Sequence, residues 1–395
     1  MRIAISGAGI AGTALAFWLH RAGHTPTLIE SAPAFRNGGY MIDFWGTGYR
    51  VAERMGIASE LRAAGYDIGH LRSVDSRGRV TSDLDVQAIR TVIDGDFTSI
   101  ARGDLAEIVF RRTADDVETM FGESITGVDD RGDGVRVTFE HSDPRDFDLL
   151  LGADGLHSNV RHLVFRPDSW AERYLGCKVA ACVVAGYRPR DELVYLTYNT
   201  PGRQVARVAL RDDLSLLLFI FRADRRNSGA SPIVELRRQF GDAGWECPQM
   251  LDAVETAEDV YFDVVSQIRM DRWWNGRVAL VGDAAGCISL LGGEGTGLAM
   301  TGAYVLAGEL DQSGGDHERA FAAYEKLMHP FVDSKQASAA RAVGFFATRT
   351  AFGLSVRNLA LRAMNFGPVL KLVAGGLLDE FDLPDYATQR PGTVT

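Results

Sequence analysis

The sequence predicts an α/β fold: a Rossmann-type nucleotide-binding domain, a second domain built on a mixed or antiparallel β-sheet, and C-terminal helices. Three observations predict it. Residues 2–30 run strand, glycine turn, helix, strand, the order of a parallel βαβ unit. Residues 178–222 are apolar runs separated by turn clusters, a pattern typical of antiparallel strands. Beyond Asp316 the pattern is helical to about Leu378.

Length and charge limit the classes of protein that this chain can be. Its 395 residues allow two domains and an extension. A formal charge of −10 argues against nucleic acid or an anionic membrane as the main partner. No uncharged apolar run approaches the roughly 20 residues of a membrane span, so we expect a cytoplasmic protein. The four cysteines form no CxxC pair and predict no metal site.

The first βαβ unit carries a GxGxxG pattern between the strand at 2–6 and the helix at 11–22. In such a turn Gly7 permits the tight bend, Gly9 lets a diphosphate approach, and Gly12 lets helix and strand pack closely. The helix N-terminus, at Ile10 and Ala11, offers N–H groups and partial positive charge to the phosphates.

Glu30 ends the strand at 25–30, 18 residues after Gly12. A carboxylate at this position can accept hydrogen bonds from a ribose diol. The first 30 residues therefore predict a dinucleotide site, without deciding between FAD and NAD.

Further elements follow from periodicity and turn residues. The sequence predicts helices over 48–62, 102–112, 232–241 and 296–310, a hairpin over 70–83, three strands within 117–151, strands at 260–269 and 277–281, and a helix break near Gly367-Pro368.

Two later segments indicate that the dinucleotide is FAD. In residues 149–161, Asp154 follows a strand and precedes a helical turn. In residues 277–297, Gly282-Asp283 follows another strand and precedes a glycine cluster, which includes Gly293 and Gly295, and then Thr296. A carboxylate there can bind the ribityl hydroxyls, and the glycines can bring backbone amides to a phosphate or flavin ring.

Together these ordered segments resemble the class A FAD-dependent aromatic-hydroxylase monooxygenases over residues 1 to about 330. The match is closest to tetracycline-inactivating and antibiotic-tailoring members. The resemblance implies a fold like that of para-hydroxybenzoate hydroxylase. We expect a discontinuous FAD-binding domain (1–70, 98–172 and 265–335), a substrate-binding sheet domain (71–97 and 173–264) and a helical extension (336–395).

The resemblance also assigns roles. It implies that Asp43 lies near the flavin, that Arg102 contacts FAD and that Arg36 contributes to NAD(P)H binding. It connects Asp154 with both nucleotides and Asp283 with the ribityl chain. The predicted cofactor-binding residues are Gly7, Gly9, Ile10, Ala11, Gly12, Glu30, Arg36, Asp43, Arg102, Asp154, Gly282, Asp283, Gly293, Gly295 and Thr296.

The sequence departs from the family pattern beside the flavin. The last motif usually continues with His and then Pro, where this chain has Gly286 and Ser289-Leu290. Gly297 replaces the usual Asn before the final helix, and Ser31 stands where relatives often carry a basic residue.

A single dinucleotide fingerprint suits a protein that holds FAD and meets NADPH or NADH transiently. The resemblance implies hydride transfer to FAD, capture of O₂ as the flavin C4a-hydroperoxide, and insertion of one oxygen atom into substrate. No protein acid or base is assigned. Hydroxylation is the default reaction; epoxidation and Baeyer–Villiger insertion stay open.

The predicted substrate is bulky, hydrophobic and polycyclic or polyketide-like. Apolar residues of the second domain and the C-terminal helices suggest a roomy cavity, although a helix stripe of this kind is more often ordinary core packing. The tail residues concerned are Phe345, Phe346, Phe352, Leu359, Leu361, Met364, Phe366 and Leu370. Tyr187, Tyr195, Tyr198 and Arg207 lie on the predicted sheet, where alternation places half of such residues outside.

Four other functions stay open from sequence. One is a flavin-dependent halogenase, although Trp273-Trp274-Asn275-Gly276 is not its W-x-W-x-I-P motif. The others are a redox-neutral flavoprotein cyclase or isomerase, a non-catalytic FAD-fold ligand-binding protein, and an NAD-dependent dehydrogenase, which Asp154 and Asp283 disfavour.

Overall fold

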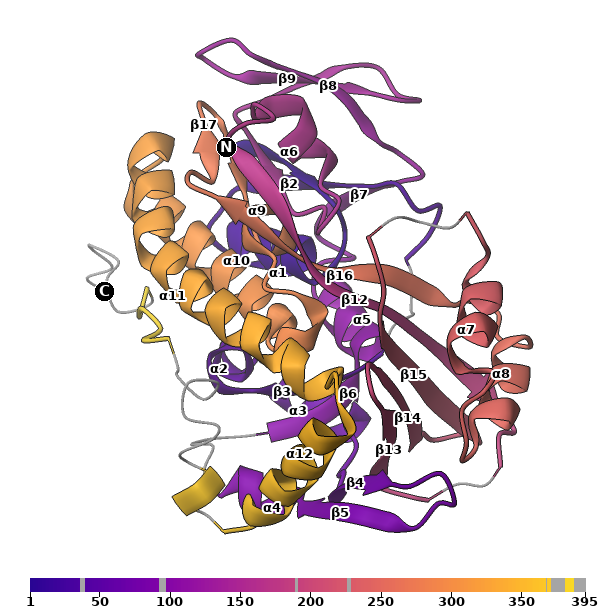
Figure 1. The fold of residues 1–395 in the computed structure, drawn as a ribbon. Helices are drawn as coiled ribbons and strands as arrows, with labels where there is room; N and C mark the ends of the chain where they lie inside the picture. The colour runs from indigo at the N-terminus through magenta and orange to yellow at the C-terminus, as the bar shows by residue number, and fades with distance from the viewer. Residues whose placement is uncertain are drawn as a thin grey trace.

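The computed structural model describes residues 1–35, 40–91, 97–188, 191–225, 229–366, 368–370 and 381–386. It confirms the predicted fold class: a mostly parallel sheet with helices, a larger mixed sheet beside it, and helices near the C-terminus (Figure 1). The domain boundaries expected from sequence stay a prediction.

The nucleotide-binding part is built on a six-stranded sheet. All neighbouring strands pair in parallel except the edge strand β17, which is antiparallel to β18. The spatial order is β17 (Trp274–Asn275), β18 (Val278–Leu280), β11 (Leu149–Gly152), β1 (Arg2–Ser6), β2 (Thr25–Glu30) and β7 (Glu118–Phe121).

The register of this sheet aligns the carboxyl ends of three strands. Ser6 at the end of β1 lies opposite Gly152 of β11, and Gly152 lies opposite Leu280 of β18. Ligands of doubly wound sheets bind outside the carboxyl ends of the strands, where the connections diverge. The segments that follow these strands therefore meet at one edge of the sheet.

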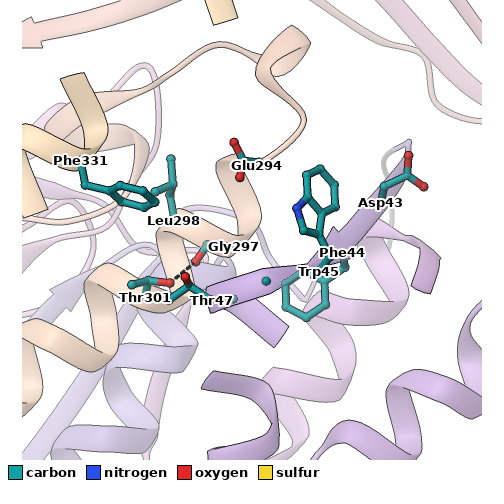
Figure 2. A pocket seen from close by; sticks show the side chains of 11 residues that line it. Asp43, Phe44, Trp45, Thr47, Glu294, Gly297, Leu298, Thr301 and Phe331 are labelled. Atoms are coloured by element: carbon teal, nitrogen blue, oxygen red, sulfur yellow. Dashed lines mark hydrogen bonds between the residues drawn. The ribbon is translucent and has the colours of Figure 1, made fainter. Parts of the chain in front are cut away.

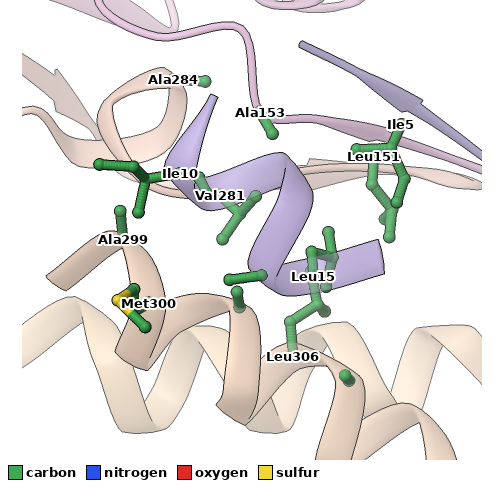
Figure 3. Close-up of a cluster of buried hydrophobic side chains, with 14 of the residues drawn as sticks. Ile5, Ile10, Leu15, Leu151, Ala153, Val281, Ala284, Ala299, Met300 and Leu306 are labelled. Atoms are coloured by element: carbon green, nitrogen blue, oxygen red, sulfur yellow. The ribbon is translucent and has the colours of Figure 1, made fainter. Parts of the chain in front are cut away.

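Helices with small residues pack closely on this sheet. α1 (Ile10–Arg21) contacts α10 (Gly295–Gln312) through a layer of buried apolar side chains that includes Leu15, Val281 and Leu306 (Figure 3). The remaining elements around the sheet are α5 (Arg102–Arg111), α6 (Asn159–Val164), α9 (Asp283–Gly286), the 3₁₀ turn η1 (Leu290–Gly292) and α11 (His317–Phe346).

The second sheet has seven strands. It is mixed because β13 pairs antiparallel with β14 but parallel with β4. Its order is β16 (Tyr261–Met270), β12 (Trp170–Ala185), β15 (Leu214–Arg222), β14 (Arg203–Ala209), β13 (Val194–Thr200), β4 (His70–Val74) and β5 (Val80–Asp85).

Helices cover both faces of the seven-stranded sheet. α7 (Pro232–Phe240) and α8 (Cys247–Val254) pack on one face, around Phe219 and Phe221. α12 (Ala351–Ala363) lies on the other side, beside β4 and β5 (Figure 1).

The smaller elements complete the fold. They are β3 (Met41–Trp45) paired with β6 (Phe97–Ala101), the sheet of β8 (Ile125–Asp130), β9 (Val135–Phe139) and β10 (Arg145–Phe147), and the helices α2 (Gly46–Met55), α3 (Ala58–Ala64) and α4 (Val86–Arg90).

Several local predictions were wrong. The expected helix over 48–62 is two helices, because Gly56 adopts φ 74° at the end of α2. Residues 117–151 hold five strands instead of three, and the eight-residue helix α8 was not predicted. The C-terminal helices separate before Ala351, where the Thr350 side chain caps α12, while Gly367 of the predicted break lies outside the described residues.

Only some of the apolar residues of the C-terminal helices are buried. Leu361 and Leu370 are buried, but Phe352, Leu359 and Phe366 are 79%, 67% and 71% exposed. The sequence pattern could not show which side of α12 meets the sheet. Among the described residues, no helix combines the length and apolar content that a membrane crossing requires.

Leu151→Ala should lower the free energy of unfolding by about 2–5 kcal/mol, because Leu151 is fully buried in the parallel sheet and its loss leaves a cavity. Leu163→Ala, at a site that is 41% exposed, is the matched control and should change stability little. Urea unfolding followed by tryptophan fluorescence measures both. Equal effects of the two variants would contradict this placement of the core.

Candidate functional site

The glycine turn after β1 requires its glycines at two positions. Gly7 adopts φ 97°, and its N–H donates to Ile29 O at 2.7 Å. A Cβ atom at Gly12 would lie 1.9 Å from Gly7 O, so no side chain fits there. A Cβ atom at Gly9 would meet nothing within 4 Å. The turn is therefore closed against β1 but open above Gly9.

The first turn of α1 is suited to an anionic group. Ile10 and Ala11 begin the helix, no side chain caps it, and its first turn contains no acidic residue. Its N–H groups and partial positive charge thus point to the open space above Gly9. These features fit the diphosphate of a dinucleotide.

Glu30 stands beside this turn, at the end of β2. Its carboxylate accepts the backbone N–H of Ala8 at 2.9 Å and that of Ala32 at 2.8 Å. These two bonds fix the side chain, and a carboxylate has further lone pairs for ligand hydroxyls. The position fits a ribose.

Asp154 lies at the same edge, after β11. Its carboxylate accepts hydrogen bonds from Ser6 Oγ at 3.3 Å, from Val160 N at 3.0 Å and from Ser158 Oγ. It therefore joins the end of β1 to the N-terminus of α6, and most of its hydrogen-bonding capacity is used within the protein.

Arg161 connects the Asp154 and Asp283 motifs. Its buried guanidinium donates to Ala284 O at 2.9 Å and to Leu156 O at 2.6 Å, and it lies over the Trp170 ring. Arg161 ends the predicted segment 149–161, but the sequence does not predict this role because the acceptor on α9 is 123 residues away in the chain.

Asp283 opens α9 directly after Gly282, which adopts φ 64°. Burial raises the pKa of Asp283, and the positive charge of Arg102 opposes this shift. Arg102 begins α5, and its backbone N–H donates to Tyr40 O at 2.9 Å. The structure thus brings Asp283 and Arg102 together, although they are far apart in sequence.

Two tyrosines that were not predicted belong to this group. The rings of Tyr40 and Tyr261 are 5.9 Å apart, and the negative charge of Asp283 acts on both. Burial raises the pKa of Tyr40 to about 12. No sequence signal marked them, because Tyr261 comes from the second sheet.

Asp43 lies on β3, opposite Ser99 of β6, whose hydroxyl donates to its carboxylate. Burial raises the pKa of Asp43. The Ser99 hydrogen bond and the positive charge of Arg90 lower it, but by less. Asp43 also raises the pKa of Tyr195, which is mainly shifted by burial. Asp43 therefore faces the seven-stranded sheet.

These side chains are accessible from solvent although protein surrounds them. Burial shifts the pKa of Asp43, Asp283 and Tyr261, yet all three keep solvent-accessible surface. A ligand can therefore reach this group, which joins the motif edge of the first sheet to β16 of the second.

A pocket opens beside Asp43, between β3, α2 and the N-terminus of α10 (Figure 2). Gly293 adopts φ 74°, while Gly295 and Thr296 begin α10. The pocket is lined by Asp43, Phe44, Trp45, Gly46, Thr47, Gly48, Glu294, Gly297, Leu298, Thr301 and Phe331.

Packing explains one departure from the family pattern, Gly286, and also the close approach of α2 and α10. A Cβ atom at Gly286 would lie 2.8 Å from Val332 of α11 and 3.2 Å from the Trp273 ring, so a histidine does not fit. A Cβ atom at Gly48 would lie 2.4 Å from Gly297 Cα, so α2 and α10 meet through glycines. Helix packing fills the space that larger side chains would need.

Other expected residues lie elsewhere. Tyr187 and Arg207 both bind Glu246 at α8, at 2.9 and 2.6 Å, and Tyr198 packs near Trp245. Arg207 and Tyr198 are on the sheet face that α7 and α8 cover, and Tyr187 follows the end of β12, outside the strands. Arg36 lies outside the described residues.

Comparisons with known proteins agree with this geometry. Residues 1–335 match the family described as "FAD binding domain". The chain is 35% identical to a flavin-dependent monooxygenase from an unknown prokaryotic organism, covering 85% of this chain and 87% of the relative. It belongs to the FAD-dependent monooxygenases.

Two further similarities extend over almost the whole chain. FAD-dependent monooxygenase asL4 of Sarocladium schorii is 28% identical, covering 98% of both proteins. The crystal structure of tetracycline destructase Tet(51) superposes with a TM-score of 0.83 at 30% identity, covering 98% of this chain and 99% of that one. The predicted resemblance, the enzyme class and the cofactor FAD are thereby confirmed.

The tryptophan pair that suggested a halogenase has a packing role in this FAD-dependent monooxygenase. Trp273 is buried and stacks on His329 with the rings 4.9 Å apart, and its backbone N–H donates to the Glu325 carboxylate at 2.6 Å.

Gly9→Ala and Gly12→Ala should have different effects although the substitution is the same. At Gly9 the methyl group has room in the protein but occupies the approach of the diphosphate, so FAD affinity should fall about tenfold or more while the apoprotein keeps its stability. At Gly12 it clashes with Gly7 O, so the fold itself should be destabilised. FAD titration and thermal unfolding separate these outcomes; a destabilised Gly9→Ala apoprotein would contradict the assignment.

Asp283→Asn should raise the melting temperature of the apoprotein near neutral pH. The folded-state pKa of Asp283 is raised, so its ionisation above that pKa costs stability that the unfolded chain does not lose. The gain should therefore shrink as the pH falls through the folded-state pKa. FAD affinity should fall about tenfold, because a charge-assisted hydrogen bond is worth roughly 1.5–3 kcal/mol. Asp252→Asn, at an exposed site, is the control; unchanged FAD affinity in Asp283→Asn would disprove the role.

Proposed function

We propose that this FAD-dependent monooxygenase takes electrons from NADPH or NADH and inserts one oxygen atom of O₂ into a bulky, hydrophobic, polycyclic or polyketide-like compound. The observation that carries the proposal is the solvent-accessible group of Asp283, Tyr40, Tyr261 and Asp43, which lies between the motif edge of the first sheet and the second sheet, with a pocket beside Asp43.

The sheet face that carries Tyr195 includes two buried apolar clusters. Val208 and Leu216 belong to one, which Tyr195 contacts. Farther along, Val179 and Ile220 pack with Leu291 of η1, next to the glycine loop before α10. These packed clusters give a rigid apolar support beside the site, which suits a large ring system held by a few polar groups.

The site residues have separable tasks in this proposal. The α1 N-terminus and Glu30 would hold the diphosphate and the ribose of FAD, and Asp283 with Arg102 would hold the ribityl side. Asp154 fixes the strand ends through Ser6 and the α6 N-terminus. FAD supplies the redox and oxygen-activating chemistry when bound. The protein positions the substrate on the sheet face and keeps water away from it.

The similar proteins support the proposed substrate class. Tet(51) is named for its action on tetracycline, a fused-ring compound, and shares the fold over nearly its whole length. We also propose the discontinuous domain division expected from sequence and a cytoplasmic location.

Purified holoenzyme should oxidise NADPH faster when a matching compound from a panel of tetracyclines and other aromatic polyketides is added. With isotopically labelled O₂, the product should carry one labelled oxygen atom, because only one atom of O₂ is transferred. Stopped assays analysed by mass spectrometry measure this. Turnover without NAD(P)H or O₂ consumption would instead indicate a redox-neutral flavoprotein.

A further inference from the structure

Arg357 is a buried cation whose hydrogen-bonding capacity is mostly unused. It lies on α12, is 6% exposed, and its Nη2 donates to Ser73 Oγ of β4 at 3.1 Å. Its Nε and Nη1 are also buried, and neither has a hydrogen-bond partner among the described residues.

No carboxylate compensates this charge in the described part of the chain. Burial alone lowers the pKa of Arg357 to about 10, so the guanidinium is still protonated at neutral pH. The buried Arg207, by contrast, pairs with Glu246 and Asp191, at 2.6 and 2.7 Å. An unpaired buried charge is costly, and strongly perturbed ionisable groups cluster at functional sites.

Arg357 lies on the sheet face that borders the site. Its partner Ser73 is 3.0 Å from Thr197 of β13, and Thr197 is two residues from Tyr195. Alternate residues of a strand share a face, and Tyr195 is close enough to Asp43 to feel its charge. Arg357 thus lies on the same face of the seven-stranded sheet as Tyr195, farther from Asp43 than Tyr195 is.

The surrounding polar groups are also incompletely paired. Asn199 Oδ1, Asn358 Oδ1 and Ser82 Oγ are buried without a hydrogen-bond partner among the described residues. Asn199 shares the face of Thr197, and its amide nitrogen donates to Thr197 Oγ1 at 3.2 Å. An arginine with free donors and nearby free acceptors suits a ligand that carries both an anionic oxygen and hydroxyl groups.

We propose that Arg357 binds an anionic oxygen of the substrate, a carboxylate or an ionised enol, and so selects acidic, polyoxygenated ring compounds. This deepens, and rests on, the proposed monooxygenase function. The Phe345 ring now covers the guanidinium, with its centroid 4.9 Å from Cζ. The anion displaces this ring, because a charge-assisted hydrogen bond is stronger than a cation–π contact with Phe.

Stability without substrate tests whether Arg357 is structural. Arg357→Met removes an uncompensated buried charge, so the FAD-bound, substrate-free enzyme should melt at the same or a higher temperature than wild type. The matched control Arg161→Met leaves the acceptors Ala284 O and Leu156 O unpaired and should lower the melting temperature. If Arg357→Met is destabilised as much as Arg161→Met, or does not fold, Arg357 is structural and the proposal is overturned.

Ligand charge tests the selectivity. An anthraquinone carboxylate and its uncharged carboxamide, titrated against flavin absorbance, should differ by tenfold or more in affinity for wild type, with the carboxylate tighter. Arg357→Met should bind the two alike, and Arg357→Lys should keep part of the preference. Wild type that binds both equally overturns the role of Arg357 but leaves the proposed function intact. The proposed function fails separately if no compound stimulates NADPH oxidation in any variant.

Discussion

The site depends above all on the register of three parallel strands. Ser6, Gly152 and Leu280 lie side by side, so the segments after β1, β11 and β18 leave the sheet at one edge. Asp154 and Arg161 then connect these segments through hydrogen bonds to Ser6, Val160 and Ala284. A shift of one strand would separate the α1 N-terminus from Asp283.

Three ionisable side chains at or near the site are surrounded by protein, and burial disfavours their charged forms. Asp43 and Asp283 both have raised pKa values, and Arg357 has a lowered one. Arg102 and Ser99 offset only part of the cost for the two acids. The large apolar core, which spans the parallel sheet, α1 and α10, supplies the stability that permits these groups.

Patterns that repeat over short distances were predictable. The strands at 2–6 and 25–30 have the expected bounds, and the hairpin predicted over 70–83 is formed by β4 and β5. The prediction of one helix over 48–62 was wrong because the apolar period continues across Gly56, whose left-handed conformation ends α2. The predicted number of strands within 117–151 was wrong because the short turns between them have the same polar composition as the strands' exposed residues.

By itself, the sequence determined the local chemistry: the glycine turn, Glu30 after the second strand, and the acids of the two later motifs, because each depends on neighbours within about twenty residues. Only the tertiary structure decided which of these groups meet. It joined Arg102 to Asp283 and brought Tyr261 from the second sheet to Tyr40. It also turned Arg357 inward and Phe352 outward on one helix. Such contacts depend on how sheets and helices pack, which no local pattern contains.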